Sequence, residues 1–411
     1  MNLVQNKLDV LAKKRSNLFN WRGQFTPEFV EYILQNFTKS GDYILDPFSG
    51  SGTVLQEAAR LGLQATGIEI NPAAYAMSRF FHFCNLGFDE RYDCCDNFEF
   101  KLNRHLASLG KKKVYCENTD YRLAYSNLLD FATVFSNVLT DKQEKILLLN
   151  LLFQSEKDKG YLLKESIRKS FFYVKKALLS LPFTEKPINA MLRDSRSVGT
   201  ELENQVDFIL TSPPYINVFN YHQNFRAIIE TFHFDLLKVA HSEFGSNRKN
   251  RSNRFKTVIQ YCMDMELAIR SFWKALKPNS QIILVLGRES NVRSTPFYNG
   301  QMVIEILNQS QGFSDIRTLE RQFTNKFGNN IKEDIIIAKK TNDLSNELYG
   351  RSVALKHLER SLATTQNGVH SDIIEAINSI NEVVPSPILN PKHILKNEHH
   401  TASRKIASGH R

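Results

Sequence analysis

One segment of the chain, residues 43–70, constrains the fold more than any other. Its apolar pattern predicts a short buried strand at 43–46, a helix at 53–61 and a second strand at 65–70, with a glycine-containing loop before the helix. A strand–helix–strand unit of this kind requires a parallel sheet that is covered by helices on both faces. We therefore expect an α/β fold built on a Rossmann-like sheet.

Helical periodicity dominates residues 79–187, between the second and third strands of this sheet, and we interpret this stretch as a mainly helical insertion or a small second domain. Helices are predicted within it at Leu123–Val138, Lys142–Phe153 and Tyr161–Leu181. Further strands are predicted at Ile188–Leu192, Val206–Leu210, Gln281–Leu286, Phe313–Thr318 and Asp334–Ala338.

Four regions follow from these patterns. Residues 1–78 hold a capped helix at 26–37 and the first half of the sheet, and residues 79–187 hold the insertion. Residues 188–340 hold the second half of the sheet. Residues 341–411 form a tail in which weak helical patterns give way, from residue 385, to a flexible polar segment with three prolines.

The loop between the first strand and its helix is suited to a nucleotide. Gly50 and Gly52 permit unusual backbone dihedrals and the close approach of a ligand. The loop lacks both the lysine of a P-loop and the third glycine of a dinucleotide site. Glu69 ends the next strand, where a carboxylate can accept hydrogen bonds from ribose hydroxyls. The glycine loop and Glu69 together favour an adenosine ligand that carries no pyrophosphate. Asp46 can bind the amino group of a cationic cofactor. The alternative is that Glu69 is a surface glutamate of an unrelated α/β protein.

Thr211-Ser212-Pro213-Pro214-Tyr215 directly follows a buried strand and is suited to hold a base. The prolines fix φ and remove two donors, so the Pro213 carbonyl beside the Ser212 hydroxyl can hold an exocyclic amine and leave its lone pair free for attack. Tyr215 can stack on the base, which must flip out of a duplex to reach the site. Ser212 is no useful general base at pH 7, so we assign it positioning, with the proton leaving to solvent afterwards. An ordinary Pro-Pro turn is the alternative.

These segments resemble motifs of the amino-methylating DNA methyltransferases, which modify adenine N6 or cytosine N4. Asp46–Thr53 resembles motif I, Glu69–Pro72 motif II, Trp21–Pro27 motif X and Arg193–Arg196 motif III, although the long insertion before motif III is a departure from the family. The resemblance implies a methyltransferase sheet and S-adenosylmethionine as cofactor, with Asp194 reaching the adenine amine of that cofactor. The implied cofactor residues are Phe25, Thr26, Pro27, Asp46, Phe48, Gly50, Gly52, Thr53, Glu69, Ile70 and Asp194, and the implied catalytic residues are Ser212, Pro213, Pro214 and Tyr215.

In the segment Thr211–Tyr215, here called the clamp, the residue before the two prolines bears on the identity of the target base. A serine at this position resembles the motif of the cytosine-N4 enzymes, whereas aspartate or asparagine is commoner there in the adenine-N6 enzymes. Ser212 therefore favours N4-methylation of a flipped cytosine in double-stranded DNA, and the family resemblance implies a restriction–modification role beside a cognate endonuclease. The alternatives are an adenine-N6 enzyme, an RNA base-amine methyltransferase and a DNA-binding relative that has lost catalysis.

The charge balance indicates a polyanionic partner. The net charge is +10, and a basic, amide-rich loop at 246–254 follows the clamp, where its side chains suit phosphates and base edges. We expect the insertion to read the DNA site with 240–256 contributing; a solvated basic loop is the alternative. Within the insertion, the aromatic residues at 171–173 are expected in the core. The loop residues predicted to contact DNA are Arg248, Lys249, Arg251 and Arg254.

Five cysteines without a Cys-x-x-Cys pair favour reduced structural thiols over a zinc site, so we expect no metal. The odd count and the absence of a secretory signal fit the cytoplasm. No apolar run approaches the ~20 residues that a bilayer requires, and we expect no membrane association.

Overall fold

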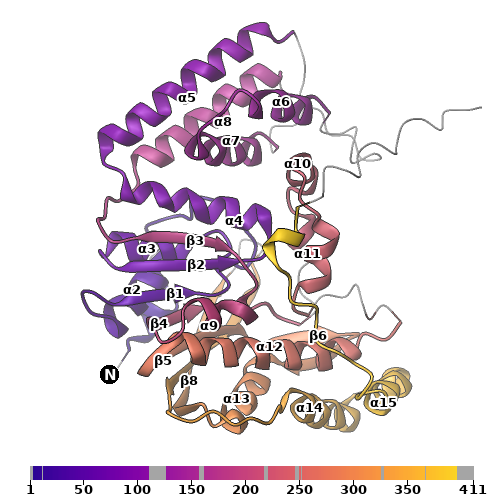
Figure 1. Cartoon of the computed structure of the whole chain (residues 1–411). Coiled ribbons are helices and arrows are strands. Elements are labelled where there is room, and N and C mark those ends of the chain that lie inside the picture. Colours follow the sequence, from indigo (N-terminus) through magenta and orange to yellow (C-terminus); the bar gives the residue numbers. More distant parts are fainter. Residues whose placement is uncertain are drawn as a thin grey trace, which may run out of the picture.

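A seven-stranded sheet with the strand order β3-β2-β1-β4-β5-β9-β8 forms the centre of the protein (Figure 1). The computed structural model describes residues 3–11, 13–110, 126–156, 162–216, 221–245, 250, 252–324, 328–365 and 367–395. The strands of the sheet are β1 (Tyr43–Asp46), β2 (Gln64–Glu69), β3 (Ile188–Leu192), β4 (Val206–Thr211), β5 (Leu276–Gly287), β8 (Phe313–Thr324) and β9 (Asn330–Lys340).

The first five strands along this order are parallel, β9 runs against them, and β8, antiparallel to β9, runs in their direction. β1 pairs in parallel with both β2 and β4, while β9 pairs antiparallel with β5 and with β8. The expected Rossmann-like α/β sheet is confirmed. The strand order reverses between β1 and β4, and ligands of open α/β sheets bind outside the carboxyl ends of the strands at such a switch point.

Two apolar cores cover the two faces of the sheet. Successive residues of β1 alternate between them, because Ile44 belongs to one core and Leu45 to the other. The first core is covered by α2 (Pro27–Phe37), α3 (Thr53–Arg60) and α4 (Pro72–Arg79). The second is covered by α9 (Val198–Glu201), α12 (Lys256–Ala275), α13 (Asn299–Ser310), α14 (Gly350–Thr364) and α15 (His370–Asn378).

Four long helices lie between β2 and β3 in the sequence and stack beyond α4, at the top of Figure 1. They are α5 (Phe88–Ser108), α6 (Ser126–Ser136), α7 (Lys142–Ser155) and α8 (Leu163–Leu179). Three match predicted helices, whereas α5 was not predicted. Their buried side chains continue the first core without a break, so these helices pack on the sheet layer instead of forming a separate body.

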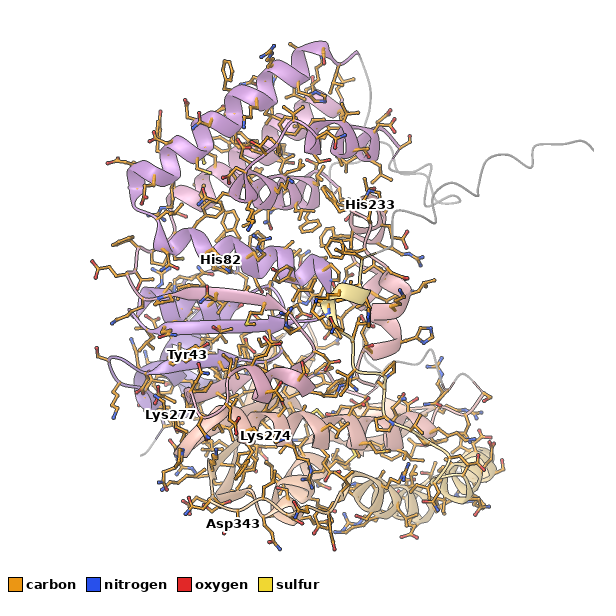
Figure 2. The ribbon with its side chains drawn as sticks, viewed as in Figure 1. Tyr43, His82, His233, Lys274, Lys277 and Asp343 are labelled. Carbon is orange, nitrogen blue, oxygen red and sulfur yellow. The ribbon has the colours of Figure 1, made fainter. Side chains whose placement is uncertain are left out.

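His82, in the short helical segment Phe80–Asn85 between α4 and α5, forms a hydrogen bond with the sheet. Its Nε2 accepts a 2.8 Å hydrogen bond from the backbone N–H of Ala190 in β3. Burial lowers the pKa of His82 to about 4, so the ring is neutral and can act as this acceptor. Figure 2 shows the side chain between α4 and the sheet.

A polar cluster closes the amino end of the parallel strands, opposite the switch point. Lys277 Nζ contacts both carboxylate oxygens of Asp207, at 2.7 and 2.8 Å, and Asp207 also accepts the Tyr43 N–H (Figure 2). Residues 277–280, which precede the strand predicted at Gln281–Leu286, lie within β5 as an irregularity, with Asn279 in the left-handed region at φ 64°.

The remaining described elements border the pocket side of the sheet or its edges. They are α1 (Gln5–Leu8), α10 (Arg226–Thr231), α11 (Leu236–Ser242) and the hairpin of β6 (Glu289–Val292) and β7 (Thr295–Tyr298). Within the described ranges, no helix combines the length and apolarity needed to cross a membrane.

The expectation of a flexible segment from residue 385 is wrong for its described part. Residues 383–395, here called the C-terminal strap, run from α15 past α12 to α11. The Val384 carbonyl accepts from Gln260, and the Ile394 carbonyl accepts from the Asp235 backbone N–H at 2.6 Å. The strap is held through its own backbone groups, a kind of contact that polar composition does not reveal.

The aromatic residues of α8 also differ in part from expectation. Phe171 is buried, as predicted, but Phe172 and Tyr173 are exposed. Positions 171 and 174 face the core of the helix bundle, so 172 and 173 must point away from it.

Candidate functional site

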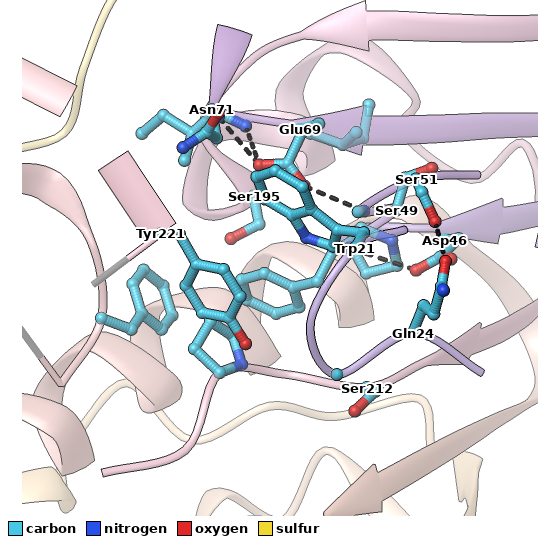
Figure 3. Close-up of a pocket in the computed structure, with 18 of the residues that line it drawn as sticks. Trp21, Gln24, Asp46, Ser49, Ser51, Glu69, Asn71, Ser195, Ser212 and Tyr221 are labelled. Carbon is cyan, nitrogen blue, oxygen red and sulfur yellow. Dashed lines mark hydrogen bonds between the residues drawn. The ribbon is translucent and has the colours of Figure 1, made fainter. Parts of the chain in front are cut away.

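An open pocket of about 900 Å³, including the solvent at its mouth, lies at the carboxyl ends of β1, β2, β3 and β4 (Figure 3). This is the switch point of the sheet, where ligands of such folds bind. Its lining residues are Trp21–Phe25, Asp46–Ser51, Thr53, Ile68–Asn71, Arg193–Ser195, Ser212, Pro214, Tyr221 and Ser242–Phe244.

The glycine loop forms the floor of the pocket. Gly50 and Gly52 have φ of 51° and 89°, in the left-handed region that favours glycine. A Cβ at Gly52 would stand 2.7 Å from the ring of Phe81, and one at Gly50 would stand 3.3 Å from the Trp21 ring. Packing behind the loop therefore requires glycine at 52, whereas at 50 the positive φ favours glycine and a side chain would also crowd Trp21.

Glu69 is locked at the end of β2 by three backbone donors. Its Oε2 accepts from Gly50 N at 2.9 Å, and its Oε1 accepts from Ile70 N at 2.9 Å and Asn71 N at 2.8 Å. These bonds fix both oxygens at the pocket wall. The side chain therefore needs no rearrangement to accept further hydrogen bonds from a ligand (Figure 3).

A hydrogen bond joins the loop to the clamp. Thr211 Oγ1 donates to Asp46 Oδ1 at 2.6 Å, and the same oxygen accepts the Phe48 N–H at 3.2 Å. Asp46 ends β1 and Thr211 ends β4, which are neighbouring parallel strands. The two motifs, 165 residues apart in the sequence, therefore meet at one edge of the sheet.

Aromatic rings line two sides of the pocket. Trp21 stacks on Tyr221 with ring centroids 5.8 Å apart and planes 17° apart (Figure 3). Phe48 packs edge-on against Phe244 at 5.3 Å. The Trp21 segment is tied to the loop because Ser51 Oγ donates to Gln24 Oε1 at 2.6 Å.

Asp194 lies at the pocket edge but is fully engaged. Its Oδ1 accepts from Arg196 N and Nε, and its Oδ2 accepts from Arg196 Nη2 and from Leu389 N of the C-terminal strap. These four bonds match the acceptor capacity of a carboxylate. An adenine amine would have to displace one of them, while the neighbouring Arg193 and Ser195 also line the pocket.

Arg196 links this edge to the strap. Its guanidinium donates to Asp264 Oδ1 at 2.8 Å and to the Ser386 and Pro387 carbonyls at 2.7 and 2.9 Å. It also lies 5.0 Å from the centre of the Phe244 ring. One buried cation thus connects motif III, the strap and an aromatic wall of the pocket.

The clamp tyrosine points away from the cofactor side. Ser212 and Pro214 line the pocket, whereas Pro213 and Tyr215 do not. The Tyr215 ring lies on Gly287 of β5, where an added Cβ would come 2.9 Å from it. Its hydroxyl lies 3.1 Å from Ser212 Oγ and donates to Glu333 of β9 at 3.4 Å.

The sequence-predicted cofactor residues divide into two groups. Thr26, Pro27 and Gly52 do not line the pocket, and Pro27 instead begins α2 behind it. The eight that do line it are Phe25, Asp46, Phe48, Gly50, Thr53, Glu69, Ile70 and Asp194.

Sequence reasoning missed the wall at Ser242–Phe244. This wall follows α11, and no motif marks it. His222 bonds Glu243 within it at 2.9 Å, and both side chains are buried. A buried His–Glu pair 21 residues apart has no local sequence signal.

Of the predicted DNA contacts, Arg248, Lys249 and Arg251 lie outside the described residues. Arg254 is described and stands two residues before α12. Across the described ranges, no group of three histidine, cysteine, aspartate or glutamate side chains is placed to hold a metal ion.

Comparison with known proteins gives a consistent match. Residues 5–79 match the model of a DNA methylase family of the N6/N4 type. Type II methyltransferase M.MjaII of Methanocaldococcus jannaschii is 21% identical over 413 aligned residues, which cover 72% of this chain and 77% of that protein. Type II methyltransferase M.BsoBI of Geobacillus stearothermophilus is 23% identical over 353, covering 66% and 69%. A solved S-adenosylmethionine-dependent methyltransferase of Methanosarcina mazei aligns over 76% of this chain and 98% of its own, at 12% identity and a TM-score of 0.34.

The chain is similar to the amino-methylating DNA methyltransferases, in agreement with the motifs. S-adenosylmethionine is its cofactor, and the pocket fits that molecule. Buried carboxylates suit its hydroxyls and its cationic groups, and aromatic walls suit its purine.

Cofactor affinity is expected to rise with pH. Burial raises the pKa of Asp46 to about 7 and that of Glu69 to about 7 in the ligand-free pocket. Below that pH both are mainly protonated, whereas a cationic ligand with ribose hydroxyls favours the ionised forms, so binding releases protons. The Kd should fall on the order of tenfold for each of the two groups, or about 100-fold in all, between about pH 6 and about pH 8.

Calorimetry in two buffers of different ionisation enthalpy measures both the affinity and the released protons. Asp46→Asn should remove part of the proton release, because one of the two titrating groups is gone. A Kd and a proton count that do not change across this range would contradict the linkage.

Proposed function

We propose that the protein transfers a methyl group from S-adenosylmethionine to the N4 amine of a cytosine flipped out of double-stranded DNA. One observation carries the proposal: clamp and cofactor loop share a single pocket, joined by the Thr211–Asp46 hydrogen bond. An amine held by the clamp therefore meets the cofactor inside one cavity. Ser212, at the pocket wall, supports cytosine, because serine there is similar to the N4 enzymes.

The chain's own residues divide the work in this proposal. Glu69 accepts hydrogen bonds from the ribose hydroxyls, and Asp46 binds the amino group. Bound S-adenosylmethionine supplies an electrophilic methyl group on a positively charged sulfur. The Pro213 carbonyl and the Ser212 hydroxyl hold the target amine with its lone pair free, while Tyr215 stacks on the base.

Target recognition is assigned to the helices beside the pocket. Phe153 of α7 packs on Phe225, the residue before α10, with ring centroids 4.5 Å apart. The insertion, at the top of Figure 1, thus meets the post-clamp helices α10 and α11, which lie below it on the right. We assign site reading to residues 79–187, with 240–256 contributing phosphate and base contacts. The Type II names of the two relatives support a restriction–modification role beside a cognate endonuclease.

Methylome sequencing of DNA from cells that express the protein gives the target base and the site together. N4-methylcytosine at one sequence is the expected result. N6-methyladenine without N4-methylcytosine would reject the cytosine assignment and leave the adenine-N6 alternative. Preferential labelling of RNA over duplex DNA would favour an RNA substrate, and failure to bind cofactor in calorimetry would favour an inactive relative.

A further inference from the structure

A hydrogen-bonded chain leads from the clamp out of the pocket and ends on a carboxylate of β9. Ser212 Oγ lies 3.1 Å from the Tyr215 hydroxyl, and that hydroxyl donates to Glu333 Oε1 at 3.4 Å. Since the phenol donates to the carboxylate, the serine hydroxyl donates to the phenol. Both hydroxyl protons therefore point toward Glu333.

The acceptor at the end of this chain forms an ion pair with a buried arginine. Arg321 Nε lies 2.8 Å from Glu333 Oε2, and the buried guanidinium sits 4.0 Å from the centre of the Phe29 ring. The backbone of Glu333 pairs with Gly287, the residue on which the Tyr215 ring lies. The carboxylate thus stands beside the clamp, with Arg321 at one of its oxygens and the phenol at the other.

We propose that Glu333 is the terminal acceptor of the proton that the target amine loses, with Ser212 and Tyr215 as the relay. The inference rests on the proposed function. The amine nitrogen bonds the methyl carbon as the methyl–sulfur bond breaks, and the electron pair stays on sulfur. The N–H proton passes to Ser212 Oγ, the serine proton to the Tyr215 oxygen and the phenol proton to Glu333 Oε1. A neutral methylated base, an uncharged thioether and a protonated glutamate result.

The relay supplies what Ser212 lacks. A hydroxyl is too weak a base at pH 7 to keep a proton, but it can pass one to a carboxylate while it receives another. An exocyclic amine that has gained a methyl group and kept its protons is a strong acid, so a carboxylate is basic enough to receive the proton. The proton need not wait for solvent to enter the clamp.

Glu333→Gln is the direct test. Glutamine can accept the phenol's hydrogen bond but cannot take its proton, so the single-turnover methylation rate should fall on the order of 100-fold. Tyr215→Phe interrupts the same chain of hydrogen bonds but keeps the ring and leaves Arg321 paired. Its single-turnover methylation rate should fall by a similar factor. Glu320→Gln is the matched control, because that glutamate of β8 pairs with Arg288 and is 69% exposed; its rate should not change.

Three further measurements separate a relay from mere positioning. Cofactor affinity by calorimetry, melting temperature, and the fluorescence of 2-aminopurine at the target position should match the wild type in Glu333→Gln. The wild-type single-turnover rate should be slower in D₂O, and both variants should lose this isotope effect.

A wild-type rate in Glu333→Gln would overturn the relay. So would slow variants without any isotope effect in the wild type, or a lost 2-aminopurine signal, because Glu333 would then only position Tyr215. If Glu333→Gln fails to fold, Tyr215→Phe decides by the same criteria. Failure of the proposed function would show separately, as a wild-type protein that methylates no DNA base.

Discussion

Replacing Arg196 by methionine is expected to lower the free energy of unfolding by about 3–5 kcal/mol. The Arg196 side chain is 0% exposed and lies between Asp194 at 1% and Asp264 at 0%. Methionine fills similar space but leaves two buried carboxylates without their cation. Burial already raises the pKa of Asp264 to about 6, even with Arg196 beside it. Urea unfolding followed by circular dichroism measures the loss.

Arg193→Met is the matched control for this prediction. Arg193 stands three residues earlier in motif III and pairs with Glu201 at 2.7 Å, but its side chain is 35% exposed. A half-exposed pair contributes about 0–1 kcal/mol. A loss below about 1 kcal/mol in Arg196→Met would show that the buried cluster relaxes or admits water.

The same substitution should reach the cofactor pocket. Arg196 donates to two strap carbonyls and lies against Phe244 in the pocket wall. Without it, the strap loses anchors at Ser386 and Pro387. We therefore expect weaker cofactor binding and faster proteolysis within residues 383–395 in Arg196→Met. Because Arg193 itself lines the pocket, Arg193→Met is the control for the proteolysis alone, which should not change.

Features with local signals were predictable from the sequence. The strand expected at 65–70 is β2 at Gln64–Glu69, and the helix expected at 26–37 is α2 at Pro27–Phe37. The signals for these features are local, because each depends on only a few neighbouring residues. They are a short apolar run, a proline at the first helical position and glycines at positive φ. The glycine loop, Glu69 and the clamp therefore lay where the motifs indicated.

Helix α5 escaped prediction because its apolar stripe is narrow. Its buried residues Cys95, Phe98, Leu102 and Leu106 recur at helical spacing, but the rest of its surface mixes acidic and polar residues with exposed aromatic ones, which blurs the pattern. Tertiary packing, more than propensity, holds such a helix in place.

Contacts between distant segments had no local signal at all. The sequence showed an acid at position 194, but not that Arg196 and Leu389 occupy both of its oxygens. It likewise showed a Ser-Pro-Pro-Tyr clamp, but not Glu333, which lies 118 residues beyond Tyr215. Such pairings follow from the strand order, which places β9 beside β5, and a strand's neighbours cannot be read from its own residues.

Glu69→Ala and Tyr215→Ala are expected to fail in opposite ways. Glu69 presents two fixed oxygens to the pocket, and hydrogen bonds to a charged group contribute about 1.5–3 kcal/mol each. Its loss should weaken S-adenosylmethionine binding on the order of 100-fold or more. Tyr215 does not line that pocket, so its loss should leave the cofactor Kd unchanged.

Tyr215→Ala should instead abolish most of the turnover. It removes the ring that rests on Gly287 and can stack on the base, and stacking contributes about 1–3 kcal/mol per base. It also removes the hydroxyl between Ser212 and Glu333. Calorimetry with S-adenosylmethionine and single-turnover methylation at saturating cofactor separate the two effects, and Tyr215→Phe isolates the ring from the hydroxyl. Equal losses of cofactor affinity in both alanine variants would show that clamp and cofactor site are one energetic unit, contrary to the geometry.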